Sequence, residues 1–138
     1  MLTKSLQDYI EFIYNKLSLK KELKAIDIAN HFGIARASVS EALIKLCEKG
    51  LIIYEGRKGI IITPEGILEA KKIIEKHNVL NAFFKDILGF EDEISSSNAC
   101  KIEHVIDKEL IDKIKDFTLY CKKNEIDKDF KNNNKEKI

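Results

Sequence analysis

Three residues of metal-ligand type stand close together at Cys100, Glu103 and His104. Their offsets of zero, three and four put a thiol, a carboxylate and an imidazole on one face of a helix. These side chains bind transition-metal ions, and one ion could contact all three. A structural explanation stays open, in which Glu103 pairs with a lysine and Cys100 is simply buried.

A carboxylate pair and a further histidine add candidate ligands elsewhere in the chain. Asp8 and Glu11 are three residues apart, so both carboxylates point to one side of a predicted first helix. Two carboxylates held close repel each other unless a cation lies between them, although a solvated acidic face is the commoner explanation of such a pair. His77 lies on an apolar stripe between Ile73 and Leu80, where a core histidine is the commoner finding.

The composition indicates a small globular protein. A chain of 138 residues with 44% hydrophobic residues can bury a real core in one domain or two small ones. No cleavable signal or membrane-spanning run is visible, so we expect a soluble cytoplasmic protein. The three cysteines are an odd number, which favours reduced thiols over a set of disulfides. The net charge is only +1, so a role in nucleic-acid binding depends on where the charges lie.

The first part of the chain reads as three helices and a hairpin. Apolar residues at steps of three and four predict a helix over 2–17, a short helix from Ala25 that stops at Gly33, and a third over 37–49. Two β-rich runs, 51–54 and 59–63, flank a basic turn and predict a hairpin. This order suggests a winged helix-turn-helix domain over residues 1–66.

The remainder reads as helical. Thr63 and Pro64 open a long helix that ends near Gly89, three serines at 95–97 offer caps for a helix over 98–105, and Asp107 starts another. Residues 67–121 are therefore expected to form an all-helical second domain. Residues 122–138 are polar and weakly patterned, which indicates a tail that is a frayed helix or disordered. The predicted fold class is mainly α with a small β wing.

The second helix of a helix-turn-helix pair enters the major groove of DNA, which makes 37–49 the predicted recognition helix. Its small and polar residues allow close approach to base edges, and two basic residues at the hairpin tip can contact phosphates. Residues 20–63 carry eight Lys or Arg against five Asp or Glu, which is a modest excess, so a protein-interaction module stays an alternative. The candidate DNA-binding residues are Arg36, Ala37, Ser38, Ser40, Glu41, Lys45, Arg57 and Lys58.

Read together, these pieces resemble the diphtheria toxin repressor and manganese transport regulator family of metal-dependent repressors. The resemblance runs from about residue 3 to residue 119, and the ordered series is specific although each fragment is not. The matching segments are Asp8–Tyr14, Ile26–Ala29, Ala37–Ser40, Lys45–Leu46, Gly50–Tyr54, Gly59–Gly66, His77 and Cys100–Val105.

The resemblance implies metal ligands at Asp8, Glu11, His77, Cys100, Glu103 and His104. Five of these six carry the residue type of the manganese-regulator branch; the sixth, Cys100, stands where that branch has glutamate and the iron-responsive branch has cysteine. The iron branch in turn has methionine at the position of Asp8, so the ligand set is a hybrid. That branch's ancillary site uses a glutamate and a histidine where this chain has Asn81 and Ser96, so the resemblance does not imply that second site. The chain resembles the short family members that lack the SH3-like domain.

The expected function is a homodimeric, DNA-binding repressor of metal-ion homeostasis with Fe(II) or Mn(II) as corepressor and double-stranded operator DNA as partner. A thiolate favours Fe(II), Co(II) or Zn(II), whereas the carboxylates suit Mn(II) and Fe(II), and Zn(II) or Co(II) could also bind in vitro. We expect dimer contacts from the helices over 79–90 and 94–105. A regulator that senses thiol oxidation through Cys47, Cys100 or Cys121 is the alternative. A metalloenzyme is disfavoured because no spare general base or substrate pocket can be named.

Overall fold

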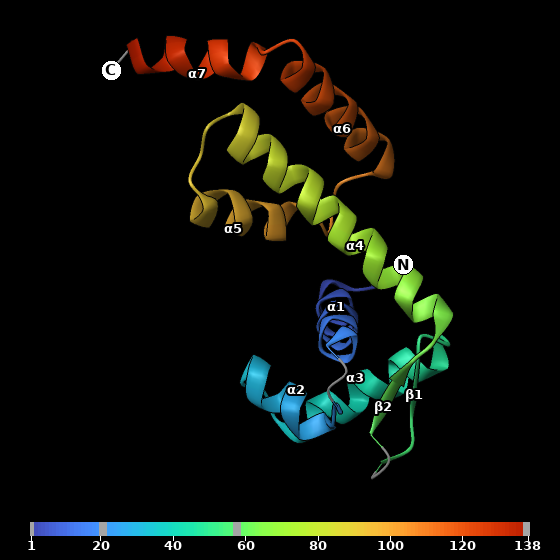
Figure 1. Cartoon of the computed structure of the whole chain (residues 1–138). Helices are drawn as coiled ribbons and strands as arrows, with labels where there is room; N and C mark the ends of the chain where they lie inside the picture. The colour runs from blue at the N-terminus through green and yellow to red at the C-terminus, as the bar shows by residue number, and fades with distance from the viewer. Residues whose placement is uncertain (1, 20–21, 57–58, 137–138) are drawn as a thin grey trace. The chain divides into compact units, whose positions relative to one another are not determined.

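The computed structural model describes residues 2–19, 22–56 and 59–136, which form two compact units, Met1–Ile73 (unit 1) and Ile74–Ile138 (unit 2). Among these residues no helix combines the length and apolar character needed to cross a membrane. The elements are α1 (Lys4–Ser18), α2 (Ala25–Phe32), α3 (Arg36–Glu48), β1 (Ile52–Tyr54), β2 (Ile60–Ile62), α4 (Pro64–Ala82), the π-helical turn η2 (Phe83–Ile87), α5 (Asp92–Ile102), α6 (Lys108–Lys123) and α7 (Ile126–Glu136) (Figure 1). The predicted fold class, mainly helical with a small β wing, is confirmed.

Local signals in the sequence set the helix ends of unit 1. The Thr3 hydroxyl accepts a hydrogen bond from the backbone N–H of Leu6, which satisfies a free donor at the start of α1. Gly33 adopts a left-handed conformation with φ of 65° at the end of α2, so the chain can turn sharply into α3. The two helices thereby form the expected helix-turn-helix.

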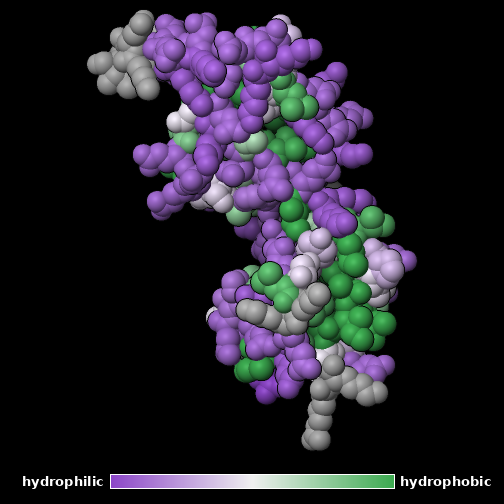
Figure 2. Space-filling view, in the orientation of Figure 1, coloured by the Kyte–Doolittle hydropathy of each residue, from purple (hydrophilic) through white to green (hydrophobic). Residues whose placement is uncertain are grey.

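The hairpin is a two-stranded antiparallel sheet in which Ile53 lies opposite Ile61. Side chains alternate between its faces, so Ile52 and Ile60 are buried while Ile53 and Ile61 are exposed. Figure 2 shows hydrophobic residues gathered over these strands. The wing thus packs one face on the core and presents an apolar outer face.

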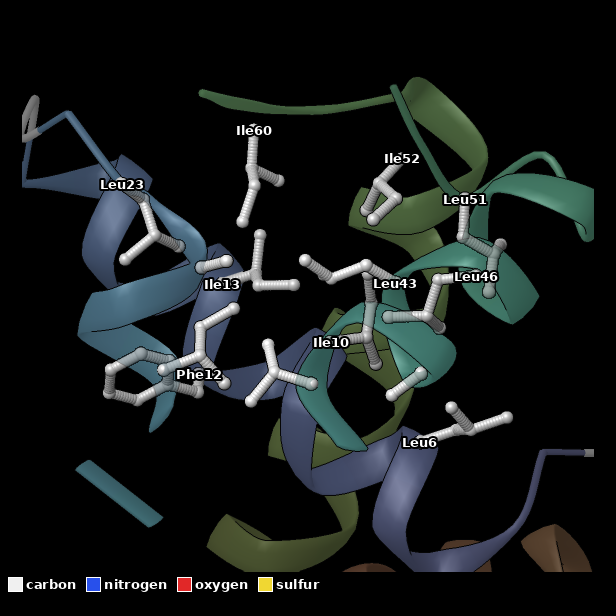
Figure 3. Close-up of a cluster of buried hydrophobic side chains, with 14 of the residues drawn as sticks. Leu6, Ile10, Phe12, Ile13, Leu23, Leu43, Leu46, Leu51, Ile52 and Ile60 are labelled. Carbon is white, nitrogen blue, oxygen red and sulfur yellow. The ribbon is translucent and has the colours of Figure 1, made fainter. Parts of the chain in front are cut away.

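The core of unit 1 is built from α1, α2, α3, the hairpin and the first part of α4. Figure 3 shows side chains from α1, α3 and the hairpin pointing toward one another, and several of the largest are fully buried. Burying a large aliphatic side chain stabilises the fold by about 1.5–3 kcal/mol each, so this cluster fixes the position of α3 on α1. The fully buried members include Ile10, Ile13, Ile28, Val39, Leu43 and Leu46.

Unit 2 has a smaller core around Leu80, Ala99 and Ile111. Asp107 precedes α6 as predicted, but α5 begins at Asp92, so the serines at 95–97 lie inside the helix and do not cap it. Ser95 is fully buried, and its hydroxyl donates to the carbonyl of Phe90 over 3.4 Å. The helix also ends at Ile102, before the predicted end at 105, so Cys100 lies in its last turn, Glu103 is its C-cap and His104 follows the helix.

The end of the chain is more ordered than its composition indicates. Residues 126–136 form α7, which packs against η2 and α6. The aliphatic chain of Lys131 lies beside Gly89, where an added Cβ would meet Lys131 Cγ at 3.5 Å. Long polar side chains cover apolar surface with their methylene groups, so a polar helix can pack here.

Glu125 links α6 to α7 with a φ of 56°, the left-handed region that L-residues disfavour. Glu125→Gly is expected to raise the free energy of unfolding by about 1 kcal/mol because glycine adopts this conformation without steric cost. Urea titration followed by circular dichroism measures the change. The neighbouring Asn124→Gly variant is the control, because Asn124 has a φ of −100° and glycine there should only destabilise. An unchanged or lowered unfolding midpoint for Glu125→Gly would contradict the expectation.

Candidate metal centre

Three residues of metal-ligand type meet in unit 2. His77 on α4, Cys100 on α5 and Glu103 at the end of α5 each offer one ligand atom, and these atoms lie within 4.8 Å of one another. The Nδ1 atom of His77 is 2.8 Å from Glu103 Oε2 and 3.6 Å from Cys100 Sγ. The structure therefore brings together residues separated by more than twenty positions in the sequence.

Glu103 is the centre of this cluster. Its side chain is only 2% exposed, and His104 Nε2 lies 3.5 Å from its second oxygen, Oε1. A buried carboxylate is costly unless hydrogen bonds or a cation compensate its charge. The imidazole rings beside its two oxygens contribute to this compensation, and a bound cation would contribute further.

The protonation state of His77 favours ligation. Burial lowers its pKa below the ordinary value for histidine, so the neutral ring predominates at pH 7. A carboxylate only accepts hydrogen bonds, so Nδ1–H donates to Glu103 Oε2. A neutral imidazole is the form that binds metal ions, and ligation through Nδ1 would require its proton to move to Nε2.

The carboxylate pair of α1 belongs to unit 1. Asp8 and Glu11 are half-buried, and burial followed by the charge of Asp8 raises the pKa of Glu11. Burial and the charge of Asp8 both disfavour a negative charge on Glu11, and a bound cation would offset both effects. The electrostatics of the pair thus fit a cation site, whereas its ligation together with the unit 2 residues stays a prediction.

Lys76, which sequence reasoning missed, connects the two elements that carry the cluster. Its ammonium group donates a 2.7 Å hydrogen bond to the backbone carbonyl of Ile106, just after α5. A lysine beside the apolar stripe of α4 looks like an ordinary solvated charge in the sequence. No local signal could have identified its partner thirty positions away.

The donor set fits a divalent transition-metal ion. One thiol, one carboxylate and imidazole nitrogen are ligands for Fe(II), Co(II) and Zn(II), and added carboxylates make Mn(II) suitable. His77, Cys100 and Glu103 already lie close enough to converge on one ion, with His104 beside Glu103. The chemistry of the site therefore matches the cofactor class expected from the sequence.

The predicted DNA-reading residues lie on the outer side of α3. Its inner side, with Val39, Leu43 and Leu46, packs into the core of unit 1. The predicted contact residues Arg57 and Lys58 lie outside the described residues. On α3, the exposed residues are Arg36, Ala37, Ser38, Glu41 and Lys45, and Ser40 is half-buried.

An apolar groove of about 440 Å³ lies in unit 2 between η2 and α5. Phe90 and Ile94 at its edge are 48% and 50% exposed. In the segment 79–90, which is expected to contribute to a dimer contact, Phe84 and Leu88 line the groove, whereas Ile87 is buried inside the unit. The groove is lined by Phe84, Leu88, Phe90, Ile94, Ser95, Asn98 and Ile102.

Two family models match almost the whole chain. Residues 1–60 match the iron dependent repressor N-terminal DNA binding domain. Residues 63–129 match the iron dependent repressor metal binding and dimerisation domain. Helix α3 and strand β1 fall in the first match, which ends at the first residue of β2, and the cluster around Glu103 falls in the second.

Full-length relatives agree with these matches. An uncharacterized HTH-type transcriptional regulator of Methanocaldococcus jannaschii is 34% identical over 119 residues, which cover 84% of this chain and 94% of that protein. The HTH-type transcriptional regulator MntR of Listeria monocytogenes is 34% identical over 116 residues, covering 84% of this chain and 81% of MntR.

A solved structure shares the fold. A manganese-dependent transcriptional repressor in complex with manganese superposes with a TM-score of 0.72 at 22% identity, over 82% of this chain and 52% of that one. The sequence-based recognition is thus confirmed by family models, full-length relatives and fold. The chain belongs to the iron-dependent repressor family of metal-dependent transcriptional regulators, to which the diphtheria toxin repressor and MntR groups also belong.

Proposed function

We propose that this chain is a cytoplasmic, homodimeric repressor whose affinity for operator DNA rises when Fe(II) or Mn(II) binds. Its ligands are Asp8, Glu11, His77, Cys100, Glu103 and His104. Residues 1–66 bind DNA, residues 67–121 bind metal and dimerise, and residues 122–138 follow as the polar end of the chain. In this role the ligand set regulates and does not catalyse, in keeping with relatives that are named transcriptional regulators.

The observation that carries the proposal is the cluster of His77, Cys100 and Glu103, with ligand atoms within 4.8 Å of one another. The raised pKa of Glu11 supports the α1 half of the ligand set, because burial and Asp8 both penalise its charge without a cation. When bound, the metal supplies positive charge that both sets of carboxylates share.

The switch follows from where the ligands stand in the chain. Asp8 and Glu11 belong to the DNA-binding unit, and the other four belong to unit 2, so common ligation would fix one pose of the two units. In a dimer this pose sets the distance between two recognition helices near one turn of DNA, about 34 Å. Metal and operator affinities are then reciprocally coupled, typically by about 1–3 kcal/mol.

The ligand types narrow the choice of metal. The carboxylates suit Mn(II) and Fe(II), whereas the Cys100 thiolate favours Fe(II) over Mn(II). Zn(II) and Co(II) are expected to bind in vitro as well, because affinity rises along the divalent series toward copper. Tight zinc binding alone would therefore not identify the physiological corepressor.

The apolar groove between η2 and α5 supports a second copy of the chain as partner. Its lining is almost entirely apolar, and the matching family model is that of a dimerisation domain. Exposed phenylalanine and isoleucine at its edge are stabilised when a partner removes them from water. A monomer in light scattering, both with and without metal, would contradict this part of the proposal.

An anaerobic operator-binding titration tests the function. Operator fragments selected from random DNA by the metal-loaded protein are titrated with pure protein in the presence of Fe(II), Mn(II), Co(II) or Zn(II), and without metal. We expect tight, sequence-specific binding with Fe(II) or Mn(II) and weak binding without metal. Equal affinity under all conditions would refute the metal switch.

Arg36 is expected to contribute directly to operator affinity. It is exposed at the first position of α3, where a guanidinium group can reach a guanine or a phosphate. Arg36→Ala should weaken operator binding by about tenfold or more at saturating metal, in line with the roughly 1–3 kcal/mol of a good contact. Fluorescence anisotropy measures the loss, and Lys49→Ala after the end of α3 is the control. Equal affinities of the two variants would remove Arg36 from the interface.

A further inference from the structure

Lys76 stands immediately before His77 on α4 and reaches across unit 2. Its side chain is half-buried, and its ammonium group donates to the Ile106 carbonyl over 2.7 Å. Hydrogen bonds from a charged donor are stronger and shorter than those between neutral groups. This bond therefore ties α4 to the segment that follows α5.

The Ile106 carbonyl belongs to the turn that carries the candidate ligands. After α5 ends at Ile102, the N–H groups of Val105 and Ile106 both donate to the Ile102 carbonyl, over 3.0 and 3.1 Å. Glu103 and His104 lie within this tight turn. A bond that fixes Ile106 to α4 thereby also fixes the backbone of Glu103 and His104 relative to His77.

A second polar link between α4 and this turn consists of ligand atoms. His77 Nδ1 and Glu103 Oε2 are 2.8 Å apart, and a cation coordinated by both residues competes with their hydrogen bond for the ring and the carboxylate. The bond from Lys76 to Ile106 uses no candidate ligand atom. It can persist when the ligands turn to a metal.

Building on the proposed metal site, we infer that Lys76 is a positioning residue for metal binding. It holds α4 and the end of α5 at the separation that lets His77, Cys100 and Glu103 share one ion. Outer-shell groups that hydrogen-bond to metal ligands typically change metal affinity by about 10–100-fold when removed, and a group that positions the ligand backbone is expected at the lower end of that range. Without Lys76, metal binding by His77 and Glu103 would also have to order the turn at 103–106.

The test compares three variants of the full chain by anaerobic Co(II) titration, followed by the visible absorption of bound Co(II). Lys76→Met keeps the length and methylene packing of the side chain but loses its donor. Lys76→Arg keeps a charged donor. Lys72→Met is the control on the same helix. It removes an exposed lysine whose ammonium group lies 3.4 Å from Glu69 Oε1.

We expect Lys76→Met to bind Co(II) about tenfold more weakly than wild type, with an altered absorption spectrum that reports changed coordination geometry. Lys76→Arg should recover most of the affinity, and Lys72→Met should match wild type. The metal-free melting temperature of Lys76→Met should lie at most a few degrees below that of Lys72→Met, because loss of one partly buried hydrogen bond costs only about 1 kcal/mol.

Two results would overturn the inference. One is unchanged Co(II) affinity and spectrum in Lys76→Met. The other is a metal-free Lys76→Met chain that is unfolded or markedly less stable than Lys72→Met, because this would assign Lys76 a general structural role. The outcome is separable from the proposed function: wild-type protein that binds Co(II) without any change in operator affinity would refute the switch and not the role of Lys76.

Discussion

Glu103→Gln is expected to raise the metal concentration needed for half-maximal operator binding by about 100-fold. Removal of a group that only hydrogen-bonds to a metal ligand already lowers metal affinity by about 10–100-fold, so loss of a ligand should reach the upper end of that range. Glu103 is the buried centre of the cluster, with His77 at one carboxylate oxygen and His104 at the other. Glutamine has the same shape but no negative charge for a cation. An anaerobic titration of operator binding, monitored by fluorescence anisotropy, measures the shift.

The metal-free Glu103→Gln chain should stay folded, because the glutamine oxygen can still accept the hydrogen bond from His77 and no charge needs to be buried. A thermal melt without metal checks this point. Glu109→Gln, an exposed substitution in the first turn of α6, is the matched control and should leave the titration unchanged. A Glu103→Gln midpoint within threefold of wild type would remove Glu103 from the ligand set.

Gly66→Ala is expected to destabilise unit 1 by about 3 kcal/mol, at the upper end of typical overpacking costs. Gly66 is buried in the first turn of α4, where the N–H group of Gly66 donates to the Thr63 hydroxyl over 3.0 Å. An added Cβ would overlap the Leu51 carbonyl oxygen and approach Ile62 Cγ1 to 2.8 Å. Backbone cannot move aside as the end of a flexible side chain can, so the hairpin or α4 would have to shift.

Gly50→Ala separates this steric effect from ordinary backbone strain. Gly50 has a φ of 74° with open space around it, so alanine there should cost only about 1–2 kcal/mol. Urea titration of both variants gives the two free energies of unfolding. Equal destabilisation would show that the close approach of α4 to the hairpin is not rigid.

Much of the fold could be predicted because local signals agree with the packing. Thr3 caps α1, Gly33 ends α2, and the hairpin forms between its two isoleucine-rich runs. Where signals conflicted, the sequence misled: the serines at 95–97 resemble caps, yet α5 starts at Asp92 and Ser95 is buried within the helix. The order of α7 comes from tertiary contacts with η2, which its polar composition does not reveal.

The site divides in the same way. Helical spacing correctly indicated that Cys100 and Glu103 share a face, since both now contribute to one cluster. The approach of His77 depends on how α4 packs against α5, so spacing could not predict it and only the family resemblance did. Lys76 was missed because its partner is a backbone carbonyl, which carries no residue signature.

Anomalous diffraction from crystals of the Mn(II)- or Co(II)-loaded protein tests the central claim most directly, because it locates the ion and its ligands. The account predicts an ion bound by Asp8 or Glu11 from unit 1 together with His77 and Glu103 from unit 2. An ion held by His77, Cys100 and Glu103 alone, with both α1 carboxylates in solvent, would contradict it and would leave metal binding without a route to the DNA-binding unit.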